Sequence, residues 1–257
     1  MLNIGASDDI FLNDGSQAII TISSRYAVNA PYTQTFTQNM PVSGWTKNSE
    51  NNGRIQQTAG RLRMDSSQDN TDSYNEAILH IDLSAAENIR LTFFQKSIVR
   101  DICTPLPSVF FNRLNGDGVS ISNDGHTWYR LLDSRDLTTD AMGQDYTVNL
   151  SDIESSIQTN EDENFQLNRY TQIKFQQSGN RSYPSGGREW DNISVTCTPK
   201  STIQFQQTTH MISQEGYTYI PVLRTNNRHF CHCGLCHTKW NGHCRAGLWC
   251  IIRAACF

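Results

Sequence analysis

The stretch Gly118-Val-Ser-Ile-Ser-Asn-Asp-Gly-His-Thr-Trp-Tyr129 decides the fold class of this chain. Apolar and polar residues alternate on both sides of Asn123-Asp-Gly125, which is typical of two half-buried strands. The Asp-Gly pair supplies the positive φ angles that a tight hairpin turn requires. The stretch therefore predicts a β-hairpin, with the indole of Trp128 packed in the core.

Short alternating runs of this kind recur along the chain, and long amphipathic helical patterns are absent from the sequence. Gly, Asn and Asp separate the runs, so we predict an all-β fold with a jelly-roll or β-sandwich domain. The expected strands are Ala18–Ser23, Gly60–Met64, Ala77–Leu83, Ile89–Gln95, Gly118–Ser122, Thr127–Leu132, Asp145–Leu150, Thr171–Gln176 and Asn192–Thr196.

Composition and charge exclude several classes of function. The 257 residues allow one or two domains, and 18% charged residues with a net charge of -4 leave no basic patch for nucleic acid. A run of about 18 apolar residues, which a membrane-spanning helix needs, does not occur in the sequence. Residues 1–9 lack the basic and apolar regions of a signal peptide. Residues 1–31 hold too few expected strands to bury a core alone, so we expect the chain to be part of a longer polypeptide.

Residues 32–198 resemble a bacterial jelly-roll module similar to MAM and laminin-G-like domains. The strings that carry the resemblance include Asn115-Gly-Asp-Gly-Val-Ser-Ile-Ser122 and Trp190-Asp-Asn-Ile-Ser-Val195. The resemblance implies a non-catalytic β-sandwich of an extracellular or cell-surface protein, without implying a particular ligand. Residues 1–31 resemble the last hairpin of a preceding β-module, followed by a linker.

Residues 199–227 resemble the first strands of a Calx-beta domain, which implies a second, truncated β-sandwich. The matching strings are Ile203-Gln-Phe205, Ser213-Gln-Glu-Gly216 and Tyr217-Thr-Tyr-Ile-Pro-Val-Leu-Arg224. Some members of that family bind calcium through the Glu that Glu215 matches. The alternative is that Glu215 only opens a tight turn before Gly216.

Residues 228–257 differ in character from the rest, because six of the eight cysteines lie there. Back-translation with a shift of one base permits the reading GTSATVDYATQNGTATAGLDYG, which resembles the continuation of a Calx-beta domain. We therefore interpret this segment as an out-of-frame tail. Two alternatives stay open: a disordered or disulfide-paired tail, and a zinc site formed by Cys233, Cys236, Cys244 and Cys250. Before the tail, the sequence leaves open whether Cys103 and Cys197 pair.

A polar loop of twelve residues has the spacing of an EF-hand calcium loop. Oxygen-bearing side chains fall at alternating positions and a Glu closes the loop; they belong to Asp65, Ser67, Asp69, Thr71 and Glu76. Position six is Asn70 in place of Gly, and strands are expected on both sides. The sequence therefore offers a Ca²⁺ site, with an ion-free polar loop as the alternative.

The remaining candidates concern sugars and catalysis. Trp45, Trp128, Tyr129 and Trp190 would form a carbohydrate-stacking platform if they were exposed on one sheet face. Asp117, Asp124 and Asp191 are the conceivable glycosidase carboxylates, but each lies in a turn context. Ser122-Asn-Asp-Gly-His-Thr-Trp128 resembles the sialidase Asp-box, one residue short, and that box is a hairpin structure. Nucleophile-elbow, P-loop, dinucleotide and HExxH motifs are absent from the sequence.

These observations predict a non-catalytic fragment of a large secreted or cell-surface multidomain protein. We expect it to act in adhesion or in binding a glycan or surface protein, with calcium-dependent stabilisation. The alternative is a carbohydrate-binding module of a multidomain extracellular enzyme. A fold of this class does not decide between them.

Overall fold

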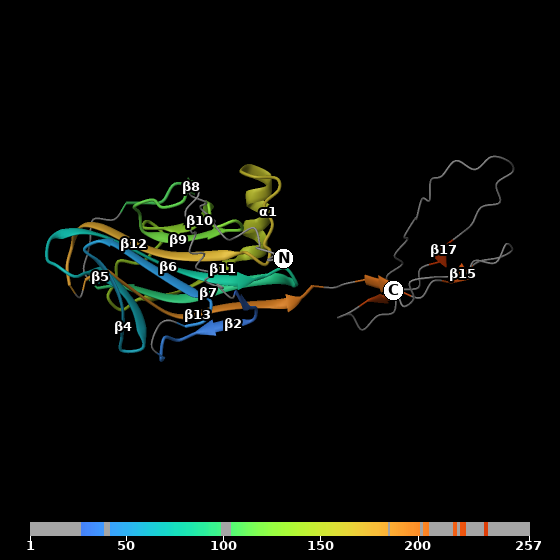
Figure 1. Cartoon of the computed structure of the whole chain (residues 1–257), viewed down its shortest axis with the longest axis horizontal. Coiled ribbons are helices and arrows are strands. Elements are labelled where there is room, and N and C mark those ends of the chain that lie inside the picture. Colours follow the sequence, from blue (N-terminus) through green and yellow to red (C-terminus); the bar gives the residue numbers. More distant parts are fainter. Residues whose placement is uncertain are drawn as a thin grey trace, which may run out of the picture. The chain divides into compact units, whose positions relative to one another are not determined.

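The computed structural model describes residues 27–38, 42–98, 104–184 and 186–200, and the backbone of four short strands between residues 203 and 235. The chain divides into two units. The larger contains residues 1–84 and 88–197, and the smaller contains residues 85–87 and 198–257. The larger unit is a sandwich of two sheets (Figure 1), which confirms the predicted all-β sandwich class.

The first sheet has seven strands in the order β1-β6-β12-β9-β10-β8, with β3 also paired to β6. Its ladders are antiparallel apart from the short parallel pair of β1 and β6. The strands are β1 Val28–Asn29, β3 Trp45–Asn51, β6 Thr71–Asp82, β8 Val109–Phe111, β9 Gly118–Ser122, β10 Thr127–Asp133 and β12 Gln172–Ser182.

The second sheet has six strands in the order β11-β7-β13-β5-β4, with β2 also paired to β13. The chain passes repeatedly between the sheets, as in a jelly roll, although β4 and β5 follow each other in one sheet and β8, β9 and β10 in the other. The strands are β2 Tyr32–Gln34, β4 Gly53–Thr58, β5 Arg61–Ser66, β7 Ala86–Ser97, β11 Gln144–Asn149 and β13 Arg188–Pro199.

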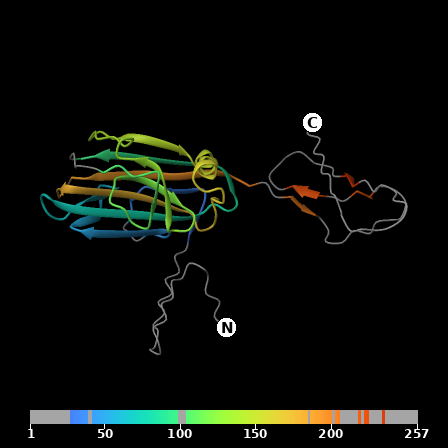
Figure 2. The same cartoon turned by 90° about the horizontal axis from the view of Figure 1, so that it is seen from above.

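One helix, α1 Leu150–Asn160, lies at one end of the larger unit (Figure 2). The side chain of Asn149 caps it by accepting a hydrogen bond from the backbone N–H of Ser151 at 3.2 Å. Leu150 and Ile157 are its buried residues. The sequence analysis did not predict this helix, although the Asn cap and the spacing of these apolar residues are the signals that mark it.

Aromatic side chains fill one half of the space between the sheets. Phe175 of the first sheet packs edge-on against Trp190 and Phe93 of the second, with ring centroids 5.2 and 5.5 Å apart. The ring centroid of Trp45 lies 5.9 Å from that of Phe175. Burying rings of this size supplies the main apolar stabilisation of the sandwich.

The other half of the interior is polar. Asn75 donates to Gln177 Oε1 at 2.7 Å, and the hydroxyls of Ser73 and Ser182 lie 2.6 Å apart. Buried amides and hydroxyls are tolerated when they bond to each other, so this half depends on its hydrogen bonds rather than on apolar packing.

A buried ion pair ties this polar half to the rest of the unit. Arg188 of β13 donates from Nε to Asp117, and the two side chains are 2% and 1% exposed. Asp117 Oδ1 accepts from the backbone N–H of Ser178 at 2.6 Å, and Arg188 donates to the carbonyl of Thr138. The pair therefore connects both sheets and the loop after β10.

The smaller unit is described as two short strand pairs. β14 Ile203–Phe205 pairs antiparallel with β16 Val222–Arg224, and β15 Thr218–Tyr219 pairs with β17 Gly234–Leu235. The Calx-beta resemblance and the frameshift stay predictions. Residues 1–26 lie outside the described residues, as do Cys103, Glu215 and the candidate zinc ligands Cys233, Cys236, Cys244 and Cys250.

The buried ion pair gives a prediction for stability. Asp117→Ala or Arg188→Met alone should lower the free energy of unfolding by about 3–5 kcal/mol, because each leaves one buried charge without its partner. The double variant should lose much less than the sum of the two, since it leaves neither charge. Urea unfolding of the four proteins measures this coupling. Additive losses would contradict it.

Candidate functional site

A strap of residues 104–117 crosses the outer face of the seven-stranded sheet, the face turned away from the other sheet. Leu106 and Phe110 of the strap pack on Trp128 of β10, with Ile78 of β6 partly buried beside them. Arg130 donates to the carbonyl of Leu106 at 2.8 Å. The strap is therefore held to the sheet by its own small apolar cluster.

A charged cluster lies beneath the strap. The side chain of Lys174 is 1% exposed, and its Nζ lies 3.3 Å from Glu76 Oε2 and 3.9 Å from the Trp128 ring centre. Burial lowers the pKa of Lys174, and the charge of Glu76 opposes that shift. Tyr74 donates to Glu76 at 2.7 Å, and burial, together with that carboxylate, raises the pKa of Tyr74. Arg113 of the strap contacts the same carboxylate at 3.3 Å.

A row of hydrogen-bonding side chains crosses the same face beyond the strap. Thr46 Oγ1 lies 2.9 Å from His80 Nε2, and the ladder places His80 opposite Gln172. Gly125 of the hairpin approaches Gln172 so closely that a Cβ there would lie 2.6 Å from Nε2. We call Thr46, His80 and Gln172 the polar row. The sequence analysis did not single it out, because only the ladder brings these residues together.

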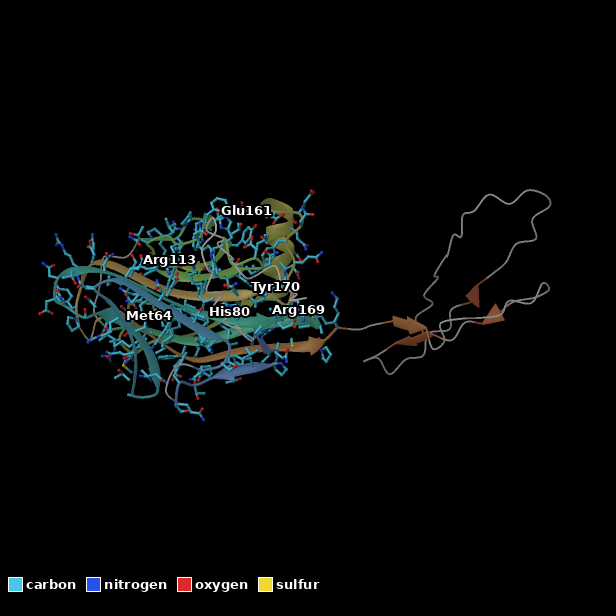
Figure 3. The ribbon with its side chains drawn as sticks, in the orientation of Figure 1. Met64, His80, Arg113, Glu161, Arg169 and Tyr170 are labelled. Carbon is cyan, nitrogen blue, oxygen red and sulfur yellow. The ribbon has the colours of Figure 1, made fainter. Side chains whose placement is uncertain are left out.

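Two exposed aromatic rings lie beside the Asn123–Gly125 hairpin, which adjoins the polar row at Gln172. Phe111 is 62% exposed, and its ring centre lies 5.7 Å from that of His126 in the hairpin. Tyr170 is 51% exposed and comes two residues before Gln172. Asn168 donates to the carbonyl of Asn123 at 3.2 Å, which holds the Tyr170 loop beside the hairpin. His80, Arg113 and Tyr170 can be located in Figure 3.

A small cleft of about 150 Å³ lies further along β12. Every side chain that lines it is polar, which suits a ligand rich in hydroxyl groups. The lining residues are Asn51, Asp72, Ser73, Thr104, Asn115, Ser178, Gly179 and Asn180.

The four predicted stacking residues are buried. Trp45, Trp128, Tyr129 and Trp190 are between 0% and 6% exposed. The expectation that they form an exposed platform does not fit this burial, because a sugar cannot reach a ring that the core covers. The exposed aromatic alternatives are Phe111 and Tyr170, whose side chains lie beside the hairpin.

The predicted calcium residues lie around the connection from β5 to β6. Both oxygens of Asp65 accept from Arg54 at 2.9 Å, and Glu76 bonds to the cluster under the strap. Ser67 donates to the carbonyl of Asn52 at 3.2 Å, and Thr71 lies 2.8 Å from Ser66. Within the described ranges, three or more acidic, His or Cys side chains do not gather as a metal site. Calcium binding stays a prediction.

The three conceivable catalytic carboxylates occupy separate structural contexts. Asp117 is paired with Arg188 inside the sandwich. Asp191 lies 3.8 Å from Arg61, and burial raises its pKa. Asp124 closes the predicted hairpin, where its Oδ1 accepts from the backbone N–H groups of His126 and Thr127 at 2.7 and 2.8 Å. The hairpin prediction is confirmed, and the Asp-box-like string serves as turn structure.

Comparisons with known proteins give weak likenesses only. No family model and no curated protein matches the sequence. The structure is similar to a family 11 carbohydrate-binding module of a cellulosomal cellulase of Clostridium thermocellum, with 15% identity, a TM-score of 0.38, and coverage of 67% of this chain and 97% of that one. It is also similar to a carbohydrate-binding module that recognises mannan, with 10% identity, a TM-score of 0.29, and coverage of 65% and 96%. These values are too low to assign a ligand.

Two further observations concern cysteine and membranes. Cys197 in β13 is a free thiol within the described residues, and burial raises its pKa. Among the described segments, no helix is long and apolar enough to cross a membrane.

The Asp124 hairpin predicts a pH dependence of stability. Burial alone would raise the pKa of Asp124, but the backbone N–H donors of His126 and Thr127 lower it below its ordinary 3.8. Its stabilisation is therefore present above that value and is lost as the pH falls through the lower folded pKa. Asp124→Ala should cost roughly 1 kcal/mol at neutral pH, discounted for its exposure. Asp124→Asn is the control that keeps the Oδ1 acceptor without the titration. Equal acid sensitivity of the wild type and Asp124→Asn in urea unfolding would contradict this account.

The calcium prediction is tested by linkage. An ion that binds the native loop raises the melting temperature at millimolar calcium, and Asp69→Ala should abolish the rise. Differential scanning calorimetry measures the melting temperature with calcium and, as the control, with magnesium. An unchanged melting temperature would count against a calcium site in residues 65–76.

Proposed function

We propose that the larger unit is a non-catalytic ligand-binding β-sandwich that takes a glycan on the outer face of its seven-stranded sheet. The observation that carries this proposal is the polar row, together with the exposed aromatic rings of Phe111 and Tyr170 beside the adjoining hairpin. A scaffold of paired strands holds these groups in fixed positions, so little ordering is required on binding.

The chemistry of the row suits sugars. Sugar hydroxyls both donate and accept hydrogen bonds, as do the hydroxyl of Thr46, the imidazole of His80 and the amide of Gln172. The apolar C–H face of a sugar ring packs well on an aromatic ring such as Phe111 or Tyr170. Since the row carries no carboxylate, guanidinium or ammonium group, a neutral glycan fits it better than an acidic one.

The cellular setting follows from the sequence resemblances. A jelly-roll module followed by the start of a Calx-beta domain is expected in a secreted or cell-surface multidomain protein. There the sandwich would serve adhesion, through a glycan or a surface protein. A carbohydrate-binding module of an extracellular enzyme would use the same face, so the ligand test below applies to both settings.

The proposal predicts the effect of removing the exposed rings. Phe111→Ala and Tyr170→Ala should each weaken binding of soluble neutral oligosaccharides about tenfold, or roughly 1.4 kcal/mol. Isothermal titration calorimetry with gluco-, manno-, xylo- and galacto-oligosaccharides measures the affinities.

Tyr183→Ala and Met142→Ala serve as matched controls, because these side chains are also exposed but lie in other loops. Equal affinities of all four variants and the wild type would exclude this face as the site. Binding of no oligosaccharide would refute the glycan assignment.

A further inference from the structure

Three polar atoms buried beneath the strap have no hydrogen-bond partner among the residues that the structure describes. They are Ser120 Oγ on β9, Trp128 Nε1 on β10 and Gln176 Oε1 on β12. Their residues are 0% to 1% exposed. Neighbouring strands carry all three on the outer face, where Ser120 lies opposite Lys174 in the ladder.

Such groups are normally satisfied when they are buried, because leaving them without a partner costs free energy that packing does not return. The three atoms differ in what they need. Trp128 Nε1 only donates, Gln176 Oε1 accepts, and the hydroxyl of Ser120 does both. Hydroxyl groups both donate and accept, so they match the hydrogen-bonding needs of all three kinds of atom.

The strap occupies this face in the manner of a ligand. Lys174 Nζ donates to the carbonyl of Asn112 at 3.0 Å, and Gln176 Nε2 donates to the carbonyls of Leu114 and Gly116 at 2.9 and 2.8 Å. Long side chains of the sheet therefore bind backbone oxygens of residues 112–116, a segment that lies between β8 and β9. The same donors are suited to sugar hydroxyls.

The segment is anchored at its two ends and exposed between them. Phe110 belongs to the apolar cluster and Asp117 to the buried ion pair, whereas residues 112–115 are exposed. Between these ends Arg113 pairs with Glu50 and Glu76, in addition to the bond from the backbone N–H of Asn112 to the carbonyl of His126 at 2.8 Å and the bonds from Lys174 and Gln176. Ion pairs at a half-exposed guanidinium are weak, so the middle of the strap is its most easily displaced part.

We infer that residues 112–116 form a displaceable cover over a second half of the glycan site, made of Ser120, Lys174 and Gln176. This inference rests on the proposed function and extends it. In the open state, ligand hydroxyls replace the strap carbonyls at Lys174 and Gln176 and bond to Ser120 Oγ and Gln176 Oε1. Because Glu76 neutralises Lys174, the covered half also selects a neutral ligand.

Arg113→Ala tests the cover. The variant removes the ion pairs of Arg113 with Glu50 and Glu76 and thereby raises the fraction of open protein. The apparent affinity for neutral oligosaccharides should therefore rise about threefold or more. Hydrogen exchange at residues 112–116 should become faster in the same variant. Unchanged or weaker binding by Arg113→Ala would overturn the inference.

Ser120→Ala tests the covered half of the site, because it should change binding affinity and stability in opposite directions. It should weaken oligosaccharide binding and raise the melting temperature, because it removes a buried hydroxyl that has no partner. Ser194→Ala is the control, since Ser194 bonds to Thr33 on the other sheet. Wild-type affinity in Ser120→Ala would also overturn the inference.

The pattern across variants separates the two proposals. If affinity falls in Phe111→Ala and Tyr170→Ala but stays unchanged in Ser120→Ala and Arg113→Ala, the glycan site stands and the cover does not. If neither the wild type nor Arg113→Ala binds any oligosaccharide of the four series, the proposed function fails and the cover fails with it.

Discussion

The ion pair of Arg188 and Asp117 is the constraint on which the rest of the larger unit depends. A charge inside a sandwich is tolerated only when its partner is held in place, and a glycine next to each of the two residues lets its segment pack closely on a neighbouring strand. A Cβ at Gly118 would lie 2.3 Å from the carbonyl of Leu132, and one at Gly187 would lie 2.0 Å from that of Met64. The pair in turn fixes the end of the strap at the start of β9.

The interior has not been optimised for stability alone. Lys96 pairs with Glu189 across β7 and β13, and the backbone N–H of Ile98 bonds to the carbonyl of Gly187. The same register sets Gln95 opposite Trp190, and both amide atoms of Gln95 and the indole Nε1 of Trp190 are buried without a partner among the described residues. Buried polar groups normally have a hydrogen-bond partner, and these groups, like those beneath the strap, have none among the described residues.

The division of the sheet's outer face explains why polar and aromatic groups lie beside each other there. One part is packed by the strap, whose apolar contacts with Trp128 need a dry surface. The other part carries the polar row, in which His80 is buried and Thr46 and Gln172 are half-buried, and the exposed rings of Phe111 and Tyr170 lie beside the adjoining hairpin. Sites on paired strands are held more rigidly than sites on loops, so the row provides the fixed half of the proposed site and the strap the movable half.

The sequence by itself determined the all-β class, the hairpin at Asn123-Asp-Gly125 and most central strands, because turn chemistry and alternation are local properties. It did not reveal β3 and β4, whose residues are largely polar because both strands lie at sheet edges. Only the tertiary structure decided which aromatic rings are covered, that Arg54 binds Asp65, and that Thr46, His80 and Gln172 form one row. Burial and partnership across strands depend on register between residues far apart in the chain, and no local pattern encodes that register.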